Sequence, residues 1–237
     1  MRFFMKKGGT AAGVIEIYES IGGGWFGGIG AKEFSRELKA LGKLDSLDIN
    51  INSPGGDVFE GQAIYTQVVA LRNTGVKVKA RIDGQAASIA SVIAMAAEEI
   101  HIAEAASIMI HDAWAFGAGR AKDFERLIAD LNMVTGAIAD VYVARTGQKV
   151  DRVRDWMDQE KRFGSGEAKE FGFATHVIDN VGVSNFTDMK IAASVFTPRL
   201  DCYRNAPLSS FAARSGKGNP YLARLADQKA RLAAAKK

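Results

Sequence analysis

The chain has 237 residues, of which 47% are hydrophobic and 24% charged, with a formal net charge of +4. This composition is ordinary for a globular protein with one substantial core. The single cysteine, Cys202, excludes an internal disulfide framework. No apolar run approaches the ~18 residues of a membrane span, and the N-terminus lacks the apolar region of a signal peptide. We therefore expect a cytoplasmic protein that does not enter a membrane.

Strand and helix patterns alternate along the first third of the chain. Alternating apolar and polar residues predict strands at 14–18, 47–52 and 76–82. Apolar residues spaced three and four apart predict helices at 31–41 and 57–72.

The same alternation continues further along the chain. Residues 88–97 are apolar on all sides, which predicts a buried helix, and short strands are expected at 99–102 and 107–110. A long helical pattern over 120–144 ends before Gly147, a typical C-terminal cap. Repeated strand–helix units predict an α/β fold with parallel strands.

The glycine-rich stretch at 22–27 fits the pattern G-x-G-x-x-G of dinucleotide-binding turns. In such a site the helix opens within the glycines, whereas residues 28–30 intervene here before helix-forming residues begin. The next strand ends in Asn52, without the acidic residue that binds a ribose. We interpret this stretch as a loop. For the protein as a whole we expect no organic cofactor, no metal and no nucleic-acid partner.

The C-terminal segment differs from the rest in charge. Residues 184–237 hold ten Lys and Arg residues against three Asp residues, and three of the four prolines. We expect a folded domain at 1–183 and a basic, partly disordered extension at 184–237. This extension is either a solvated tail or a segment that binds an acidic partner or is itself processed.

Three sequence features are candidates for the parts of an acyl-transfer site. The sequence Ser-Pro-Gly-Gly at 53–56 is either a tight turn or a loop whose backbone amides meet a substrate oxyanion. Ser88 follows a strand and opens the buried helix, so it is either a helix-capping serine or a nucleophile. Among the three histidines, His111 ends an apolar strand and is the candidate base, whereas His101 and His176 are more typical of structural positions.

Three short segments together resemble the proteolytic subunit of the Clp protease. They are Ser-Pro-Gly-Gly at 53–56, Gly-Gln-Ala-Ala-Ser at 84–88 and Met-Ile-His at 109–111, within a similarity that spans roughly residues 14–180. The resemblance implies a Clp/crotonase-like fold, an α/β β-β-α superhelix that assembles into rings, with residues 120–144 as the handle helix that joins rings.

The resemblance also implies roles for individual residues. Ser88 corresponds to the nucleophile, His111 to the general base, and the amides of Gly56 and Ile89 to the oxyanion donors. The family places an aspartate before the segment that contains Glu167-Ala168.

This chain departs from the family at the acid. Gapless alignment on that segment puts Glu160 at the aspartate's position, with Asp158 two residues earlier. A glutamate can orient an imidazole as an aspartate does. Glu160 is therefore the predicted acid, with Asp158, or a dyad without an acid, as alternatives.

Two further segments, 108–114 and 157–173, are closer to the Clp-like head-maturation proteases of phages and prophages. We therefore expect an ATP-independent serine endopeptidase that processes capsid, scaffold or portal precursors. One alternative is a housekeeping Clp-type subunit that works with an ATPase unfoldase. Another is a crotonase-fold acyl-CoA enzyme, and a third is a catalytically idle ring that scaffolds assembly.

Overall fold

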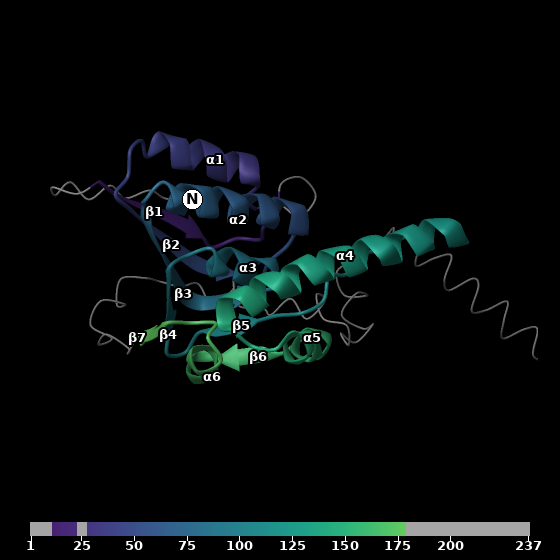
Figure 1. Cartoon of the computed structure of the whole chain (residues 1–237). Helices are drawn as coiled ribbons and strands as arrows, with labels where there is room; N and C mark the ends of the chain where they lie inside the picture. Colours follow the sequence, from purple (N-terminus) through teal and green to yellow (C-terminus); the bar gives the residue numbers. More distant parts are fainter. Residues whose placement is uncertain (1–10, 23–27, 179–237) are drawn as a thin grey trace, which may run out of the picture. The chain divides into compact units, whose positions relative to one another are not determined.

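The computed structural model of the chain describes residues 11–22 and 28–178. The expected basic extension at 184–237 and most of the glycine-rich stretch lie outside these residues. The described part is an α/β domain, as the alternating patterns predict (Figure 1).

The domain is built around one sheet in which five strands pair in the order β1-β2-β3-β4-β7, all parallel. Two short strands, β5 and β6, extend the sheet from the far end of β3. Buried aliphatic residues alternate with more exposed ones along β1, β2, β3 and β4, so one face of the sheet is apolar and the other is polar. The strands are Ala12–Ile17 (β1), Ser46–Ser53 (β2), Lys77–Ala87 (β3), Glu99–Ala103 (β4), Ser107–Met109 (β5), Arg162–Gly164 (β6) and His176–Ile178 (β7).

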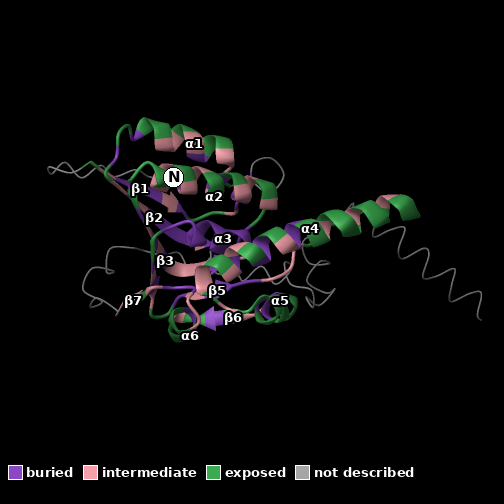
Figure 2. Cartoon of the chain, viewed as in Figure 1, coloured by how far each residue is buried: buried purple, intermediate pink, exposed green. Residues whose placement is uncertain are grey.

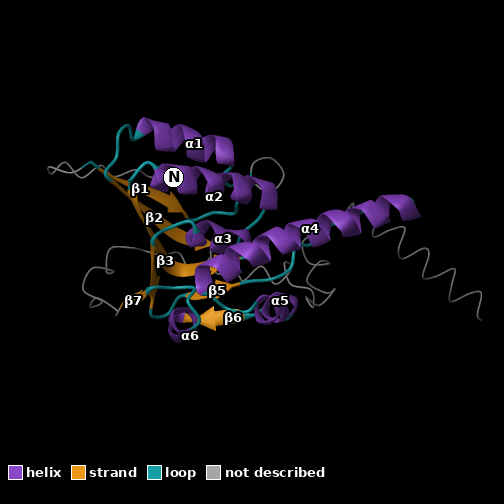
Figure 3. Cartoon of the chain, viewed as in Figure 1, coloured by secondary structure: helices purple, strands orange, loops and turns teal. Residues whose placement is uncertain are grey.

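Helices cover the apolar face (Figure 3). Helix α3 is buried along its whole length between the sheet and its neighbours α2 and α4, as its wholly apolar sequence predicts. The helices are Ala31–Ala40 (α1), Val58–Asn73 (α2), Ile89–Met95 (α3), Ala121–Thr146 (α4), Val150–Asp158 (α5) and Ser165–Glu170 (α6).

Strand β3 is longer than its alternating pattern predicts. The prediction ends at residue 82, where Asp83-Gly84 resembles a turn, but the strand continues to Ala87. It does so because β5 pairs with residues 85–87 after β4 has paired with residues 79–82. Because of this change of partner, β3 runs directly up to Ser88 with no loop between them.

The C-terminal part of the domain contains elements that the sequence patterns do not indicate: α5, β6, α6 and β7. They are short, so they carry too few periods of hydrophobic alternation to be recognised. Strand β6 also runs antiparallel to β5, whereas the strand–helix alternation predicts only parallel neighbours. The β5–β6 pair matters for the site because it brings the segment around residue 160 beside the end of β5.

Helix α4 has two different halves (Figure 2). Its C-terminal half packs into the core through residues that include Val134, Ile138 and Tyr142, and it ends at Gly147 in the predicted left-handed cap. Its N-terminal half extends past the core and exposes Phe124 and other apolar side chains. By length and composition alone α4 could cross a membrane, although its C-terminal half is part of the protein core.

Candidate active site

The three sequence motifs meet where parallel strands end. β2 ends at Ser53, β3 at Ala87 and β5 at Met109, and these three strands are neighbours in the sheet. Their carboxyl ends therefore present the Ser-Pro-Gly-Gly loop, Ser88 and His111 at one edge of the sheet, which is where α/β folds place their ligands.

Ser88 occupies a strained turn between β3 and α3. Its φ of 55° and ψ of −133° lie in a region that L-residues rarely adopt. Although Ser88 is the N-cap residue of α3, its side chain makes no capping hydrogen bond. Instead, Ser88 Oγ lies 2.7 Å from Nε2 of His111. The structure thus gives this hydroxyl a base as its partner rather than a helix terminus.

The glycine loop packs directly against Ser88. A Cβ atom on Gly55 would lie 2.6 Å from the Cβ of Ser88, closer than real side chains approach. Gly55 also has a φ of 91°. Sequence reasoning singled out Gly56 and missed this role of Gly55, although the paired glycines were the available signal. The loop can touch the serine only because residue 55 has no side chain.

Two backbone amides near Ser88 are left for a ligand. Within the loop, the Gly55 N–H donates to Ser53 Oγ at 3.2 Å and the Asp57 N–H donates to the Ile21 carbonyl at 2.8 Å. Between them, the Gly56 N–H has no protein acceptor among the described residues. Ile89 is the first residue of α3, so its N–H has no acceptor within the helix. The resemblance to the family implies that these two N–H groups are the oxyanion donors.

The Ser88 backbone is held from both sides. Its N–H donates to the Met109 carbonyl at 2.8 Å, and its carbonyl accepts a hydrogen bond from Ser91 Oγ at 2.6 Å. The buried Tyr142 hydroxyl of α4 lies 2.8 Å from the same Ser91 Oγ. Because the one hydroxyl hydrogen of Ser91 points to Ser88, Tyr142 is the donor in this pair. Sequence analysis missed Ser91 and Tyr142, since they are 51 residues apart and only the fold joins them.

Glu160 reaches the site through the antiparallel β5–β6 pair. Met109 pairs with Arg162, and the Ile110 N–H donates to the Lys161 carbonyl at 3.1 Å. Glu160 directly precedes Lys161 in the turn after α5, and its charge acts on the His111 ring. Asp158 is the last residue of α5.

Glu160 occupies the second strained turn of the domain. The Glu160 N–H donates to the Met157 carbonyl and the Lys161 N–H to the Trp156 carbonyl, at 3.1 and 2.9 Å. These two bonds form a Schellman cap at the end of α5, with Glu160 at the left-handed position, φ 51°, that glycine usually occupies. Ser88 and Glu160 are the two non-glycine residues with positive φ in the described part of the chain.

The electrostatics of His111 are set by burial and by two carboxylates. Burial of the ring lowers the pKa of His111, while the charge of Glu160, and then that of Asp112, raises it in part. His111 therefore favours its neutral form, in which Nε2 can accept a proton. In the described residues Glu160 acts on His111 through its charge, without a hydrogen bond between them.

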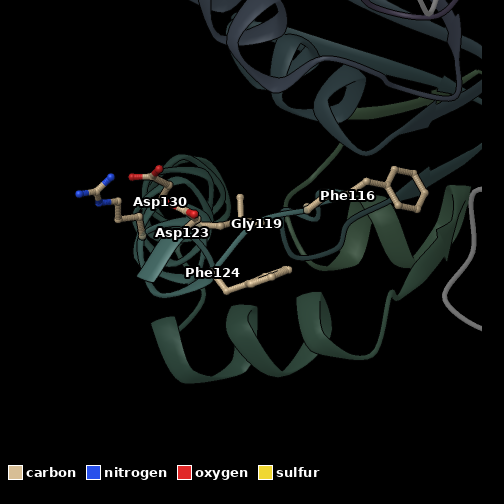
Figure 4. Close-up of a pocket in the computed structure, with 9 residues that line it drawn as sticks. Phe116, Gly119, Asp123, Phe124 and Asp130 are labelled. Atoms are coloured by element: carbon tan, nitrogen blue, oxygen red, sulfur yellow. The ribbon is translucent and has the colours of Figure 1, made fainter. Parts of the chain in front are cut away.

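One open hollow of about 350 Å³ lies elsewhere, between the loop that precedes α4 and the first turns of that helix (Figure 4). Phe116 and Phe124 line it together with Asp123 and Asp130, and neither Ser88 nor His111 does. The candidate site is therefore the region around Ser88 and His111 and does not coincide with this hollow. His101 and His176 lie apart from Ser88, on β4 and β7.

The chain was compared with models of known protein families. The Clp protease family matches residues 31–181, which is more than half of the chain and contains every residue of the site. A mixed α/β domain with a parallel sheet fits the Clp/crotonase-like fold that the sequence predicts. The chain belongs to the Clp protease family.

Proposed function

We propose that this protein is a serine endopeptidase in which Ser88 is the nucleophile and His111 the general base. The observation that carries the proposal is the 2.7 Å contact between Ser88 Oγ and His111 Nε2, made by a serine in a strained strand-to-helix turn. A nucleophilic serine needs an adjacent base, and positive φ at a non-glycine residue is typical of functional turns.

The proposed reaction uses four groups of this chain. Ser88 Oγ attacks the carbonyl carbon of a peptide bond while Nε2 of His111 takes the hydroxyl proton. The N–H groups of Gly56 and Ile89 donate to the oxyanion of the tetrahedral intermediate. The intermediate then expels the amine, which receives the proton from His111. Water, deprotonated by His111, hydrolyses the acyl ester and restores Ser88.

Glu160 is the proposed acid of the triad. Two observations favour it over Asp158: it lies next to the β5–β6 pair, and its charge has the largest electrostatic effect on the His111 ring. A carboxylate there stabilises the imidazolium that forms when His111 takes the proton.

We further propose that the substrates are capsid, scaffold or portal precursors of a phage or prophage head, cleaved in the host cytoplasm without an ATPase. Segments 108–114 and 157–173 support this choice, since they resemble the head-maturation branch of the family. The second of these segments holds the β6 strand and the Glu160 turn.

The exposed half of α4 supports assembly into a ring or stacked rings. Phe124, Ile128 and Met133 have exposed fractions of 43, 58 and 64%, and Trp114 and Phe116 lie in the preceding loop at 49 and 83%. Apolar surface of this extent on one projecting helix is typical of a subunit contact. Light scattering of the purified protein tests it: we expect a multiple of the 25.5 kDa chain mass, and a monomer at micromolar concentration would refute assembly.

Incubation of the purified protein with an unfolded protein substrate, without nucleotide or other proteins, tests the proposed activity. We expect fragments from the wild type and none from Ser88→Ala, with Ser35→Ala on α1 as a serine-to-alanine control away from the site. Acyl-CoA hydrolysis in place of proteolysis would favour the crotonase alternative. Cleavage of co-expressed head precursors, compared with cleavage that needs an added ATPase, separates the two peptidase roles.

A further inference from the structure

Three potential metal ligands converge on the polar face of the sheet, at its β4–β7 edge. Glu99 and His101 lie two residues apart on β4, so their side chains emerge on the same face. Strand β7 pairs with β4 in a register that sets His176 directly beside His101. Residues in register on neighbouring strands share a face, so all three side chains gather at one place.

The geometry of this cluster is close to that of a coordination site. The rings of His101 and His176 have centroids 4.6 Å apart, and His101 Nε2 lies 2.9 Å from Glu99 Oε2. One ligand atom from each of the three residues lies within 4.8 Å of the others. In a tetrahedral zinc site, ligand atoms about 2.0–2.1 Å from the metal are roughly 3.3 Å apart. Side-chain rotations that bring the ligand atoms a little over 1 Å closer together would therefore complete the site.

Thr175 determines which nitrogen of neutral His176 carries the proton. The Thr175 hydroxyl donates its one hydrogen to the Ile100 carbonyl at 2.9 Å. Its oxygen, 2.9 Å from His176 Nδ1, can therefore only accept a hydrogen bond from that nitrogen. Neutral His176 then carries its proton on Nδ1 and has its lone pair on Nε2. Histidines that bind metals characteristically have their second nitrogen held in this way.

We propose that Glu99, His101 and His176 bind a divalent transition-metal ion, with Zn²⁺ as the best match. Two imidazole nitrogens and one carboxylate oxygen form a ligand set that Zn²⁺ accepts, with a fourth position left for water.

The charges around the cluster allow a cation to approach. Lys79, the neighbouring cation on β3, forms an ion pair with Asp48 at 3.1 Å. The side chains of His101 and Glu99 have exposed fractions of 25 and 58%, so the metal can enter from solvent.

The proposed site is structural rather than catalytic. The partner of His101 on β3 is Arg81, seven residues before Ser88, which places the cluster roughly 20 Å from the nucleophile at ~3.3 Å per residue. A metal there would join β7, a strand of three residues, to β4 and so fix the end of the described chain to the sheet.

Competition with a chromophoric chelator for Zn²⁺, measured on the full-length protein, tests the proposal. We expect saturable binding of one equivalent. Glu99→Gln, His101→Ala and His176→Ala should each weaken it by roughly 100-fold or more, since loss of even an outer-shell partner costs about 10- to 100-fold. His111→Ala is the matched control, because it removes a histidine from the other site and should leave this binding unchanged. Zn²⁺ should also raise the Tm of the wild type but not of His176→Ala.

Binding of equal strength by wild type and His176→Ala, or loss of binding in His111→Ala alone, would overturn the proposal. Circular dichroism shows whether each variant is folded, and His176→Gln provides a second replacement that keeps polarity. Nitrogen NMR of metal-free wild type gives an independent readout: we expect His176 to carry its proton on Nδ1, and the opposite tautomer would contradict the arrangement. Neither measurement depends on peptidase activity.

Discussion

The two strained turns of the domain differ in how they are held. The turn at Ser88 is fixed by hydrogen bonds to Met109 and Ser91, and Gly55 packs against its side chain. The turn at Glu160 is a helix cap whose bonds involve only its own local backbone, and glycine would satisfy it equally well. The first turn is therefore imposed by the fold, while the second keeps a residue that its local structure does not need.

This difference indicates two kinds of functional strain. At Ser88 the surrounding structure compensates a conformation that costs about 1–3 kcal/mol and aims the hydroxyl at His111. At Glu160 no hydrogen bond to His111 compensates the strained conformation. The carboxylate acts on the ring only through its charge. We infer that the Ser88–His111 pair is assembled in advance, whereas the carboxylate acts as an electrostatic support.

The largest expected effect is the loss of the Ser88 hydroxyl. Ser88→Ala should reduce kcat for peptide cleavage by about five to six orders of magnitude, since the reaction then has no nucleophile. The Tm should stay within a few degrees of wild type, because the backbone bonds of the turn remain. Peptide hydrolysis assays and calorimetry check the two halves. A variant that still cleaves at an appreciable fraction of the wild-type rate would remove Ser88 from the mechanism.

The second effect separates the two candidate acids. Glu160→Gln should lower kcat by roughly 10²- to 10⁴-fold, because a neutral amide cannot stabilise the imidazolium. Asp158→Asn is the matched control and should change kcat less than tenfold. Steady-state kinetics on both variants decide the assignment: the reverse ranking would make Asp158 the acid, and two silent variants would indicate a Ser–His dyad.

The third effect concerns stability at the two turns. Glycine adopts positive φ without penalty, so Ser88→Gly and Glu160→Gly should both raise the free energy of unfolding, by about 1 kcal/mol or more. The gain should be larger for Ser88, whose ψ of −133° lies outside the left-handed helical region that Glu160 occupies. Denaturant unfolding measures both. A destabilised Glu160→Gly would mean that its carboxylate makes contacts essential to the fold.

The smallest effect is a shift in pH dependence. The base must be neutral to act, so kcat/KM falls below the pKa of His111, which burial holds under its ordinary value of 6.5. Glu160→Gln removes the charge that raises the pKa of His111 most. The acid limb, the fall of kcat/KM at low pH, should therefore move to lower pH. Asp158→Asn should leave the limb in place. A limb that moves to higher pH in Glu160→Gln would contradict the proposed position of the charge.

The sequence was sufficient for the elements with long periodic patterns and for the residues in specific motifs. Ser88 and His111 could be found because each lies in a short distinctive segment at the end of a predicted strand. Ser91 and Tyr142 could not be found in this way, since their roles depend on a contact across the fold. Glu160 was suggested only by spacing, because α5 and β6, the elements on either side of its turn, are too short to predict.

The most direct test of the account is labelling by a fluorophosphonate, with the modified residue identified by mass spectrometry. These reagents form a covalent bond with a serine only when a base activates its hydroxyl. We predict one label on Ser88 in the wild type, unchanged in Ser35→Ala and absent in both Ser88→Ala and His111→Ala. A folded wild-type protein that stays unlabelled, or a label on another serine, would contradict the central claim that Ser88 and His111 form an activated pair.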